Sequence, residues 1–180
     1  MDELTRLAVA AGQGDRFALG AFVRRSQPDV WRLCASLSDR DQADDLTQET
    51  YLRAIPALPG FRAESSARTW LLGIARRTCA DEVRRRVRRR ALADRLNRRR
   101  LVTTSPAADG MPALQILIDG LSEERRQAFV LTQVLGLEYA EAAEVCGCPI
   151  GTIRSRVARA RADLVAAVQA DDVDGETELG

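Results

Sequence analysis

The stretch from Leu137 to Leu164 constrains the fold most, because it has the layout of two helices joined by a tight turn. An alanine-rich helix is predicted from about Tyr139. Gly147 stands where a left-handed turn conformation is needed, and Pro149 opens the second helix, where its missing N–H costs nothing. The spacing therefore predicts a helix-turn-helix.

The second of these helices has two different faces at roughly 100° per residue. The apolar face consists of Ile150, Ile153, Val157, Ala160 and Leu164. The opposite face is short and basic, which suits insertion into a DNA major groove, and the first-turn N–H groups suit a phosphate. The candidate DNA-binding residues are Thr152, Arg154, Ser155, Arg156, Ala158 and Arg159. The alternative is an amphipathic surface helix whose arginines are merely solvated.

Length and composition predict an all-α protein with small cores. The chain has 180 residues, and 46% of them are hydrophobic but only 4% aromatic. No segment alternates strictly enough to compete as a strand. Residues 91–112 lose helical periodicity and gain Pro, Ser and Thr, so they are predicted to be a flexible linker between two small helical domains. The second domain, residues 113–168, has four expected helices.

The charge is segregated although the net charge is only +1. Residues 76–100 hold twelve arginines against three acidic residues, which is typical of a segment that binds a polyanion. Within this segment Arg76, Arg77 and Arg84 are placed to lie along a nucleic-acid strand. Residues 169–180 are acidic and are predicted to be disordered.

An acidic face is predicted on the helix over residues 39–55. Ala43, Leu46, Thr50 and Ala54 point inward, whereas the opposite side is acidic and carries an exposed leucine. No histidine accompanies the carboxylates, so acid-base catalysis is not expected. A protein-binding surface is favoured over a merely solvated face. Its candidate residues are Asp41, Asp44, Asp45, Gln48, Glu49 and Leu52.

The segment from Pro56 to Ser66 is predicted to be a loop, and a long helix is expected from Ala67. Trp70 invites a base-stacking role, but its place in the apolar stripe of that helix favours core packing. The stripe of the earlier helix, which begins with Phe17 and contains a break or kink at Pro28, is likewise expected to be core.

No cofactor, metal or membrane insertion is expected. The chain has no signal peptide and no apolar run of membrane-spanning length, so we expect a cytoplasmic protein with reduced cysteines. Cys146 and Cys148 form a C-x-C, but the chain contains no histidine and the other two cysteines lie far away in sequence. Turn or core thiols are therefore favoured over a zinc site.

Three ordered motifs, DDLTQETYLRA, FRAESSARTWLLGIARR and GTIRSRVARAR, resemble those of bacterial RNA polymerase sigma factors of the extracytoplasmic-function group. The likeness spans roughly residues 14–168. It implies a non-catalytic transcription initiation factor that binds core RNA polymerase and directs it to promoters. Residues 1–90 would form region two and residues 113–168 region four, and an anti-sigma factor is an expected partner.

The resemblance also assigns roles to the candidate surfaces. The acidic helix would bind the clamp helices of the largest polymerase subunit. The minus-ten element would be recognised, and its melted strand held, by Arg62, Ala63, Glu64, Ser65, Ser66, Arg76, Arg77 and Arg84. The candidate DNA-binding residues of the last helix would read duplex DNA at the minus-thirty-five element.

Two other functions stay open from the residues alone. A stand-alone helix-turn-helix regulator would use the amino-terminal half for dimerisation or sensing, and would bind palindromic half-sites without polymerase. A nucleic-acid enzyme is disfavoured because the chain lacks His, Lys and clusters of metal ligands.

Overall fold

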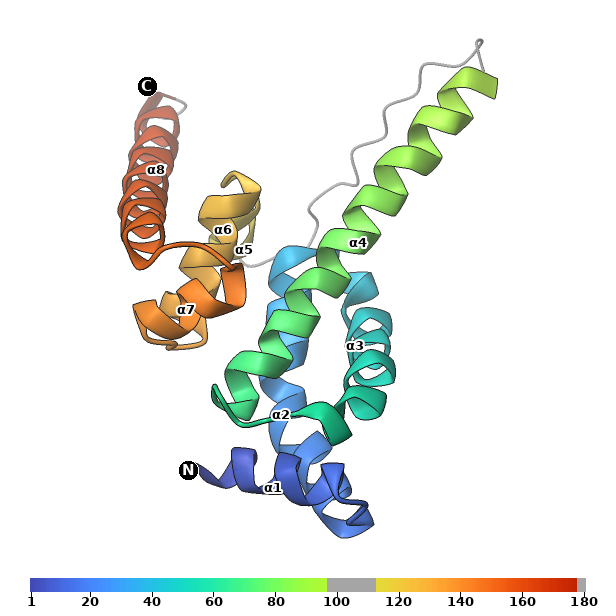
Figure 1. Ribbon diagram of the computed structural model, residues 1–180. Helices are drawn as coiled ribbons and strands as arrows, with labels where there is room; N and C mark the ends of the chain where they lie inside the picture. Colours follow the sequence, from blue (N-terminus) through green and yellow to red (C-terminus); the bar gives the residue numbers. More distant parts are fainter. Residues whose placement is uncertain (97–112, 178–180) are drawn as a thin grey trace.

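The computed structural model describes residues 1–96 and 113–177, and within these ranges all the regular secondary structure is helical, which confirms the all-α prediction (Figure 1). An amino-terminal unit precedes the undescribed residues 97–112, and a carboxyl-terminal unit follows them. The predicted linker falls largely on this undescribed segment.

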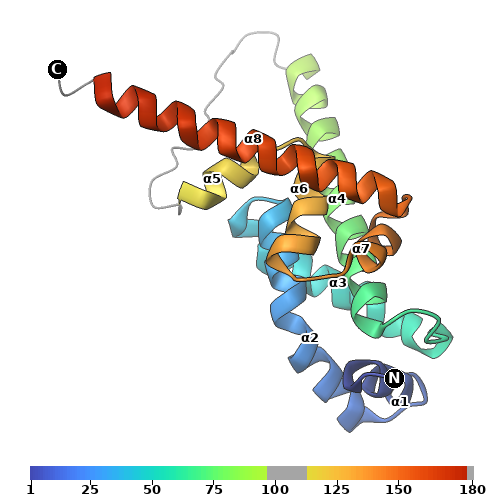
Figure 2. The ribbon, with the colours of Figure 1, turned by 90° about the vertical axis from the view of Figure 1, so that its left-hand side faces the viewer.

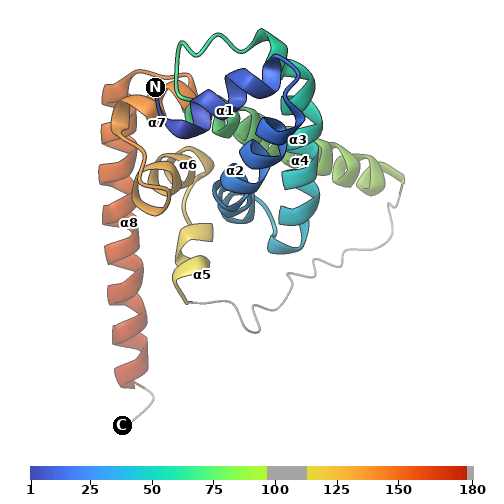
Figure 3. The same cartoon turned by 90° about the horizontal axis from the view of Figure 1, so that it is seen from below.

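The amino-terminal unit contains four α-helices and two short 3-10 turns. Its helices are α1 (Glu3–Gly12), α2 (Arg16–Leu37), α3 (Ala43–Ala57) and α4 (Ala67–Leu96); its turns are η1 (Arg40–Gln42) and η2 (Leu58–Gly60). α2, α3 and α4 pack around a core that includes the fully buried Phe22, Leu33 and Leu71. α1 lies across one end of this bundle, as the views from the front and from below both show (Figures 1 and 3).

Two of these helices begin directly after an aspartate that caps them. Asp15 accepts hydrogen bonds from the backbone N–H groups of Phe17 at 2.8 Å and Ala18 at 3.0 Å. Asp2 accepts from the N–H of Thr5 at 2.9 Å. Each carboxylate satisfies first-turn donors that have no partner inside the helix.

The carboxyl-terminal unit has the four expected helices. They are α5 (Ala113–Asp119), α6 (Glu123–Phe129), α7 (Tyr139–Cys146) and α8 (Ile150–Thr177). A π-helical segment, η3 (Val130–Val134), prolongs α6. Gly147 ends α7 with φ +65°, and the N–H of Cys148 donates to the carbonyl of Ala143 at 3.1 Å. This turn confirms the predicted helix-turn-helix.

The two units pack against each other, and α7 lies against α4. The turned view shows α8 crossing the outer side of the carboxyl-terminal unit, with its far end projecting beyond the other helices (Figure 2). α8, the second helix of the helix-turn-helix, is thus on the outside, whereas α6 and α7 lie between it and the amino-terminal unit.

Several expected boundaries differ in the structure. Pro28 lies inside a continuous α2, and Pro56 lies in the last turn of α3, so the predicted loop narrows to residues 61–66. Proline has no N–H, so the backbone carbonyl four residues earlier in α3 lacks its usual donor. Because Pro56 is exposed, water can donate to this carbonyl instead. Phe17 was expected in the core, but it is 92% exposed because it lies in the first turn of α2, beyond the packed bundle.

Helices also extend into both segments that were predicted to be irregular. α4 continues to Leu96, six residues past the expected domain boundary at residue 90. α8 continues to Thr177, which covers most of the tail predicted to be disordered. In α4 the good helix formers Ala, Leu and Arg follow the packed part of the helix and allow it to propagate. In α8 the continuation contains Asp and Gly, which are poor helix formers, but no proline interrupts it.

Candidate functional site

The acidic face of α3 and η1 is open to solvent, as the sequence predicts. We call Asp41, Asp44, Asp45, Gln48, Glu49 and Leu52 the acidic surface; all of them are exposed except Glu49, which is half-buried. Leu52 is 70% exposed although it belongs to a well-packed unit. The exposure of this face agrees with the predicted geometry, and its role as a protein-binding surface stays a prediction.

Neighbouring side chains hold two of these carboxylates in place. The indole Nε1 of Trp31 donates to Asp44 at 2.8 Å, and Arg53 donates from Nε to Glu49 at 2.8 Å. Asp41, Asp45 and Gln48 make no such contacts in the described part of the chain, so they are free to bind a partner.

A groove between α3 and α4 borders the acidic surface. Its volume is about 460 Å³, and its lining includes Asp45 and Glu49 on one side and Arg85 and Arg89 on the other. The side-chain oxygen of Gln42 is buried at this groove without a hydrogen-bond partner. The groove extends the acidic surface toward the basic end of α4.

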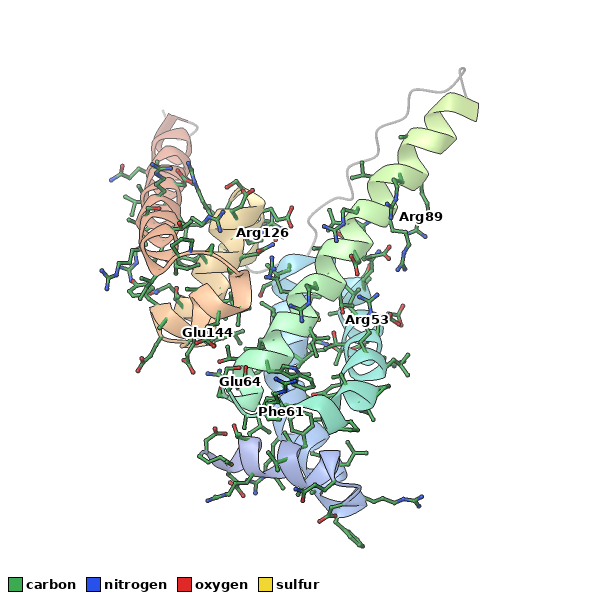
Figure 4. The ribbon with its side chains drawn as sticks, in the orientation of Figure 1. Arg53, Phe61, Glu64, Arg89, Arg126 and Glu144 are labelled. Atoms are coloured by element: carbon green, nitrogen blue, oxygen red, sulfur yellow. The ribbon has the colours of Figure 1, made fainter. Side chains whose placement is uncertain are left out.

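Loop 61–66 forms a small cavity at the beginning of α4. The cavity has a volume of about 240 Å³ and is lined by Gly60, Phe61, Arg62, Ala63, Glu64, Ser65 and Trp70. Pockets for drug-sized ligands measure about 300–1,000 Å³, so this one suits a smaller group. The rings of Phe61 and Trp70 lie 5.1 Å apart, centroid to centroid, and Figure 4 shows Phe61 and Glu64 beside the start of α4.

Trp70 packs against the core, as its place in the apolar stripe predicts, and a base-stacking role for it stays a prediction. It is half-buried, and its ring also lines the cavity. Ser66, also predicted for this site, accepts from the N–H of Thr69 at 3.1 Å and so caps α4. Ser66 thus fixes the junction between the loop and the helix.

The three arginines expected along a nucleic-acid strand have different surroundings. Arg77 is exposed and free of ion pairs within the described structure. Arg84 pairs with Asp81 at 2.6 Å, and Asp81 also accepts from Arg53 at 2.7 Å. The hydrogen bonds from Arg53 and then Arg84 hold the pKa of the Asp81 carboxyl below its usual value.

Arg76 does not lie on an open face, which differs from the expectation that it points away from packed structure. Its Nε donates to the backbone carbonyl of Val145 on α7 at 2.9 Å, and its NH1 reaches Gln127 on α6 at 3.4 Å. The guanidinium of Arg76 is therefore hydrogen-bonded to the carboxyl-terminal unit, because the two units pack together along α4.

Arg68 is an interface residue that the sequence analysis did not identify. It donates from Nε to Asp29 at 2.7 Å and from NH2 to the carbonyl of Leu135 at 2.6 Å. The acceptor in the other unit is a backbone atom 67 residues away in sequence, so no sequence motif marks the pair.

The outer face of α8 agrees with the predicted DNA-reading face. Arg154, Ser155, Ala158 and Arg159 are exposed, and Thr152 and Arg156 are half-buried. Ile153, Val157 and Ala160 are fully buried beneath them. Ile150 was expected in the packed face but is 40% exposed, because it begins the helix and borders an open hollow. On this face the exposed Arg154 and Arg159 have the small side chains of Ser155 and Ala158 beside them, so the helix can approach base edges closely.

The four cysteines are free thiols, as expected. Burial raises the pKa of the Cys146 thiol to about 11, although the nearby Arg76 opposes the shift. Among the described residues no three His, Cys, Asp or Glu side chains gather as metal ligands. Over the same residues, every helix is too short or too polar to cross a bilayer.

Two family models match the chain, one in each unit. The model described as sigma-70 region 2 matches residues 22–100, and the model described as sigma-70 region 4 matches residues 113–164. The first contains the acidic surface and loop 61–66, and the second contains the whole helix-turn-helix.

Curated relatives are similar over nearly the full length. The ECF RNA polymerase sigma factor SigC of Mycobacterium tuberculosis is 52% identical over 178 residues, which cover 97% of this chain and 96% of that protein. The ECF sigma factor EcfG of Rhodopseudomonas palustris is 35% identical, over 85% of this chain and 84% of that protein.

Two solved structures share the fold. The sigma factor RpoE of Bartonella quintana, in complex with the anti-sigma factor NepR, has a TM-score of 0.71 and 32% identity, and the match covers 85% of this chain and 98% of that one. CnrH, in complex with the cytosolic domain of CnrY, has a TM-score of 0.73 and 28% identity, with 94% and 99% covered.

Proposed function

Because the chain belongs to the extracytoplasmic-function group of the sigma-70 family, we propose that it directs core RNA polymerase to promoters by reading two DNA elements and helping to melt one of them. Sigma factors are transcription initiation factors and are not themselves enzymes. The work of opening DNA would come from binding energy, which must be larger for the melted strand than for the duplex.

The observation that carries the proposal is the separation of two exposed surfaces onto two units. The acidic surface lies on the amino-terminal unit, and the arginine-bearing face of α8 lies on the carboxyl-terminal one. A protein that binds an enzyme and DNA at the same time needs surfaces of opposite charge that do not overlap.

The acidic surface would bind the polymerase core. Its free carboxylates, Asp41 and Asp45, suit basic side chains, and the exposed Leu52 suits an apolar contact at the centre of the interface. The groove between α3 and α4 would accept a side chain at the edge of this interface.

The DNA contacts would be divided between two sites. Arg154, Ser155 and Arg159 on α8 would read the minus-thirty-five element in the major groove. Loop 61–66 would take up an unstacked base of the minus-ten element, with its cavity and the Phe61–Trp70 pair providing the stacking surface. Arg76, Arg77 and Arg84 would hold the backbone of the melted strand.

An anti-sigma factor is the proposed regulatory partner. Both solved relatives, RpoE and CnrH, are bound to partners in their structures, and the RpoE partner is named as an anti-sigma factor. Polymerase acts on chromosomal DNA, so the proposed place of action is the cytoplasm.

The decisive experiment is transcription in vitro with core polymerase and a promoter library. We expect the protein to select templates that share two separated sequence elements, and to bind duplex DNA only weakly without core polymerase. Tight binding of the purified protein to palindromic sites, without any response to core polymerase, would instead identify a stand-alone helix-turn-helix regulator.

A further inference from the structure

Helix α1 contacts the chain on both sides of loop 61–66. On the carboxyl-terminal side, the N–H of Ala67, the first residue of α4, donates to the Oγ1 of Thr5 at 2.9 Å. On the amino-terminal side, Gly12 lies against η2, where an added Cβ would come within 2.5 Å of the Leu58 carbonyl oxygen. One helix thus fixes the two ends of the loop that forms the cavity.

The hydroxyl of Thr5 makes two hydrogen bonds in this arrangement. It accepts from Ala67 and donates to the carboxylate of Asp2, which also caps α1. Thr5 is only 3% exposed, and Ala67 is completely buried. The first N–H groups of a helix have no partner inside it, and a buried one that loses its acceptor is costly. Thr5, together with the cap residue Ser66, therefore fixes where α4 begins.

The loop itself needs such support, because it contains a strained residue. Ala63 has φ +54°, in the left-handed region that residues with a Cβ rarely adopt. Such a conformation persists only when the surrounding structure enforces it. The loop is exposed at Arg62 and Glu64, so its ends at Leu58 and Ala67 supply an important part of the constraint, together with the packing of Phe61 on Trp70.

We propose that α1 holds loop 61–66 in the shape that captures a nucleobase, and that Thr5 is the positioning residue through which it acts. This inference rests on the proposed function, because it assigns a task to the same cavity. In this proposal Thr5 does not contact DNA itself. It positions Ala67, the first residue of the helix whose first turn carries Trp70 on the cavity wall.

The test compares Thr5→Val, which keeps the shape but removes the hydroxyl, with Thr5→Ser, which restores it. Thr50→Val is the matched control, because Thr50 is also buried and its hydroxyl donates to the Leu46 carbonyl of its own helix at 2.7 Å. The other neighbour of this hydroxyl is the Cys34 thiol of α2, and within the described structure it has no bond to the ends of loop 61–66. Each full-length variant is assembled with core polymerase. The probe is a promoter recovered from the library, with 2-aminopurine placed at each minus-ten position in turn.

We expect holoenzymes with wild type, Thr5→Ser and Thr50→Val to unstack the base at one minus-ten position, with similar half-saturating concentrations of holoenzyme. Thr5→Val should need about fivefold to tenfold more holoenzyme for the same signal, the factor that corresponds to one hydrogen bond. Its affinity for core polymerase should not change. If Thr5→Val folds too weakly, Asp2→Ala, which removes the partner of the Thr5 hydroxyl from an exposed position, should shift the same signal in the same direction.

The possible failures are distinguishable. Absence of an unstacked base with the wild-type holoenzyme would refute the minus-ten part of the proposed function, and this inference with it. A normal signal with Thr5→Val, or an equal loss with Thr5→Ser, would overturn the positioning role alone. An equal loss with Thr50→Val would also overturn it, since the effect would then be general destabilisation.

Discussion

The Nε of Arg76 on α4 lies 2.9 Å from the carbonyl oxygen of Val145 on α7, and this hydrogen bond joins the two units. The acceptor is the backbone of the residue before Cys146, at the end of the first helix of the helix-turn-helix. An N–H group that donates to a carbonyl is not available to a phosphate. Strand binding through the Nε of Arg76 therefore requires the two units to separate, whereas the NH2 group takes part in neither of the hydrogen bonds that Arg76 makes to the other unit.

We predict that Arg76→Ala shifts the free protein toward separated units. A hydrogen bond from a charged group is worth about 1.5–3 kcal/mol, so its loss should favour separation by roughly tenfold or more. Small-angle X-ray scattering should then report a larger radius of gyration. Arg77→Ala is the matched control, because Arg77 is the exposed neighbour on the same helix. Equal scattering from all three proteins would contradict the prediction.

Local sequence signals predict the helix-turn-helix and the acidic surface well. Gly147 adopts the left-handed conformation that its position between two helical patterns requires, and Leu52 is exposed as its place in the acidic face predicts. Both features depend on periodicity and turn chemistry within a few residues, which a sequence displays directly.

Contacts between distant segments cannot be predicted in this way. Arg68, Arg76 and Thr5 each bond a backbone atom more than sixty residues away. Every residue except proline offers the same backbone donor and acceptor, so neither partner carries a recognisable signature. Sequence reasoning could nominate Arg76 for DNA binding, but it could not show that the carboxyl-terminal unit already occupies it.

We predict that Asp45→Arg abolishes binding to core polymerase. Asp45 is an exposed carboxylate that borders the α3–α4 groove, and a reversed charge at an interface both removes an attraction and adds a repulsion. Co-sedimentation with the purified core measures this directly. Glu144→Arg is the control, because it reverses an exposed acid on α7, in the other unit (Figure 4). Loss of binding in Glu144→Arg but not in Asp45→Arg would reverse our assignment.

We predict that Arg159→Ala reduces promoter discrimination and leaves core binding unchanged. A side chain that reads a base edge contributes about 1–3 kcal/mol to discrimination between correct and incorrect base pairs. Transcription from templates with single changes in the minus-thirty-five element should show a relaxed preference at one position. Arg161→Ala serves as the control, because Arg161 instead contacts Gln133 within the unit at 2.7 Å. Unaltered selectivity in Arg159→Ala would contradict the prediction.

We predict that Cys146 resists alkylation in the folded protein near neutral pH. Burial raises the pKa of its thiol from 9.0 to about 11, and only the thiolate reacts with iodoacetamide. Two pKa units correspond to a roughly hundredfold smaller thiolate population. Peptide mass spectrometry of native and urea-unfolded protein should show this difference, and the native rate should rise until the pH approaches 11.

The same shift predicts how this thiol affects stability. The unfolded chain loses the Cys146 proton near pH 9.0, whereas the folded chain retains it until about 11. Ionisation therefore favours the unfolded state above pH 9.0, and Cys146→Ser should make the free energy of unfolding less sensitive to pH between these two values. Equal labelling rates in native and unfolded protein would contradict both expectations, because they would place the thiol in contact with water.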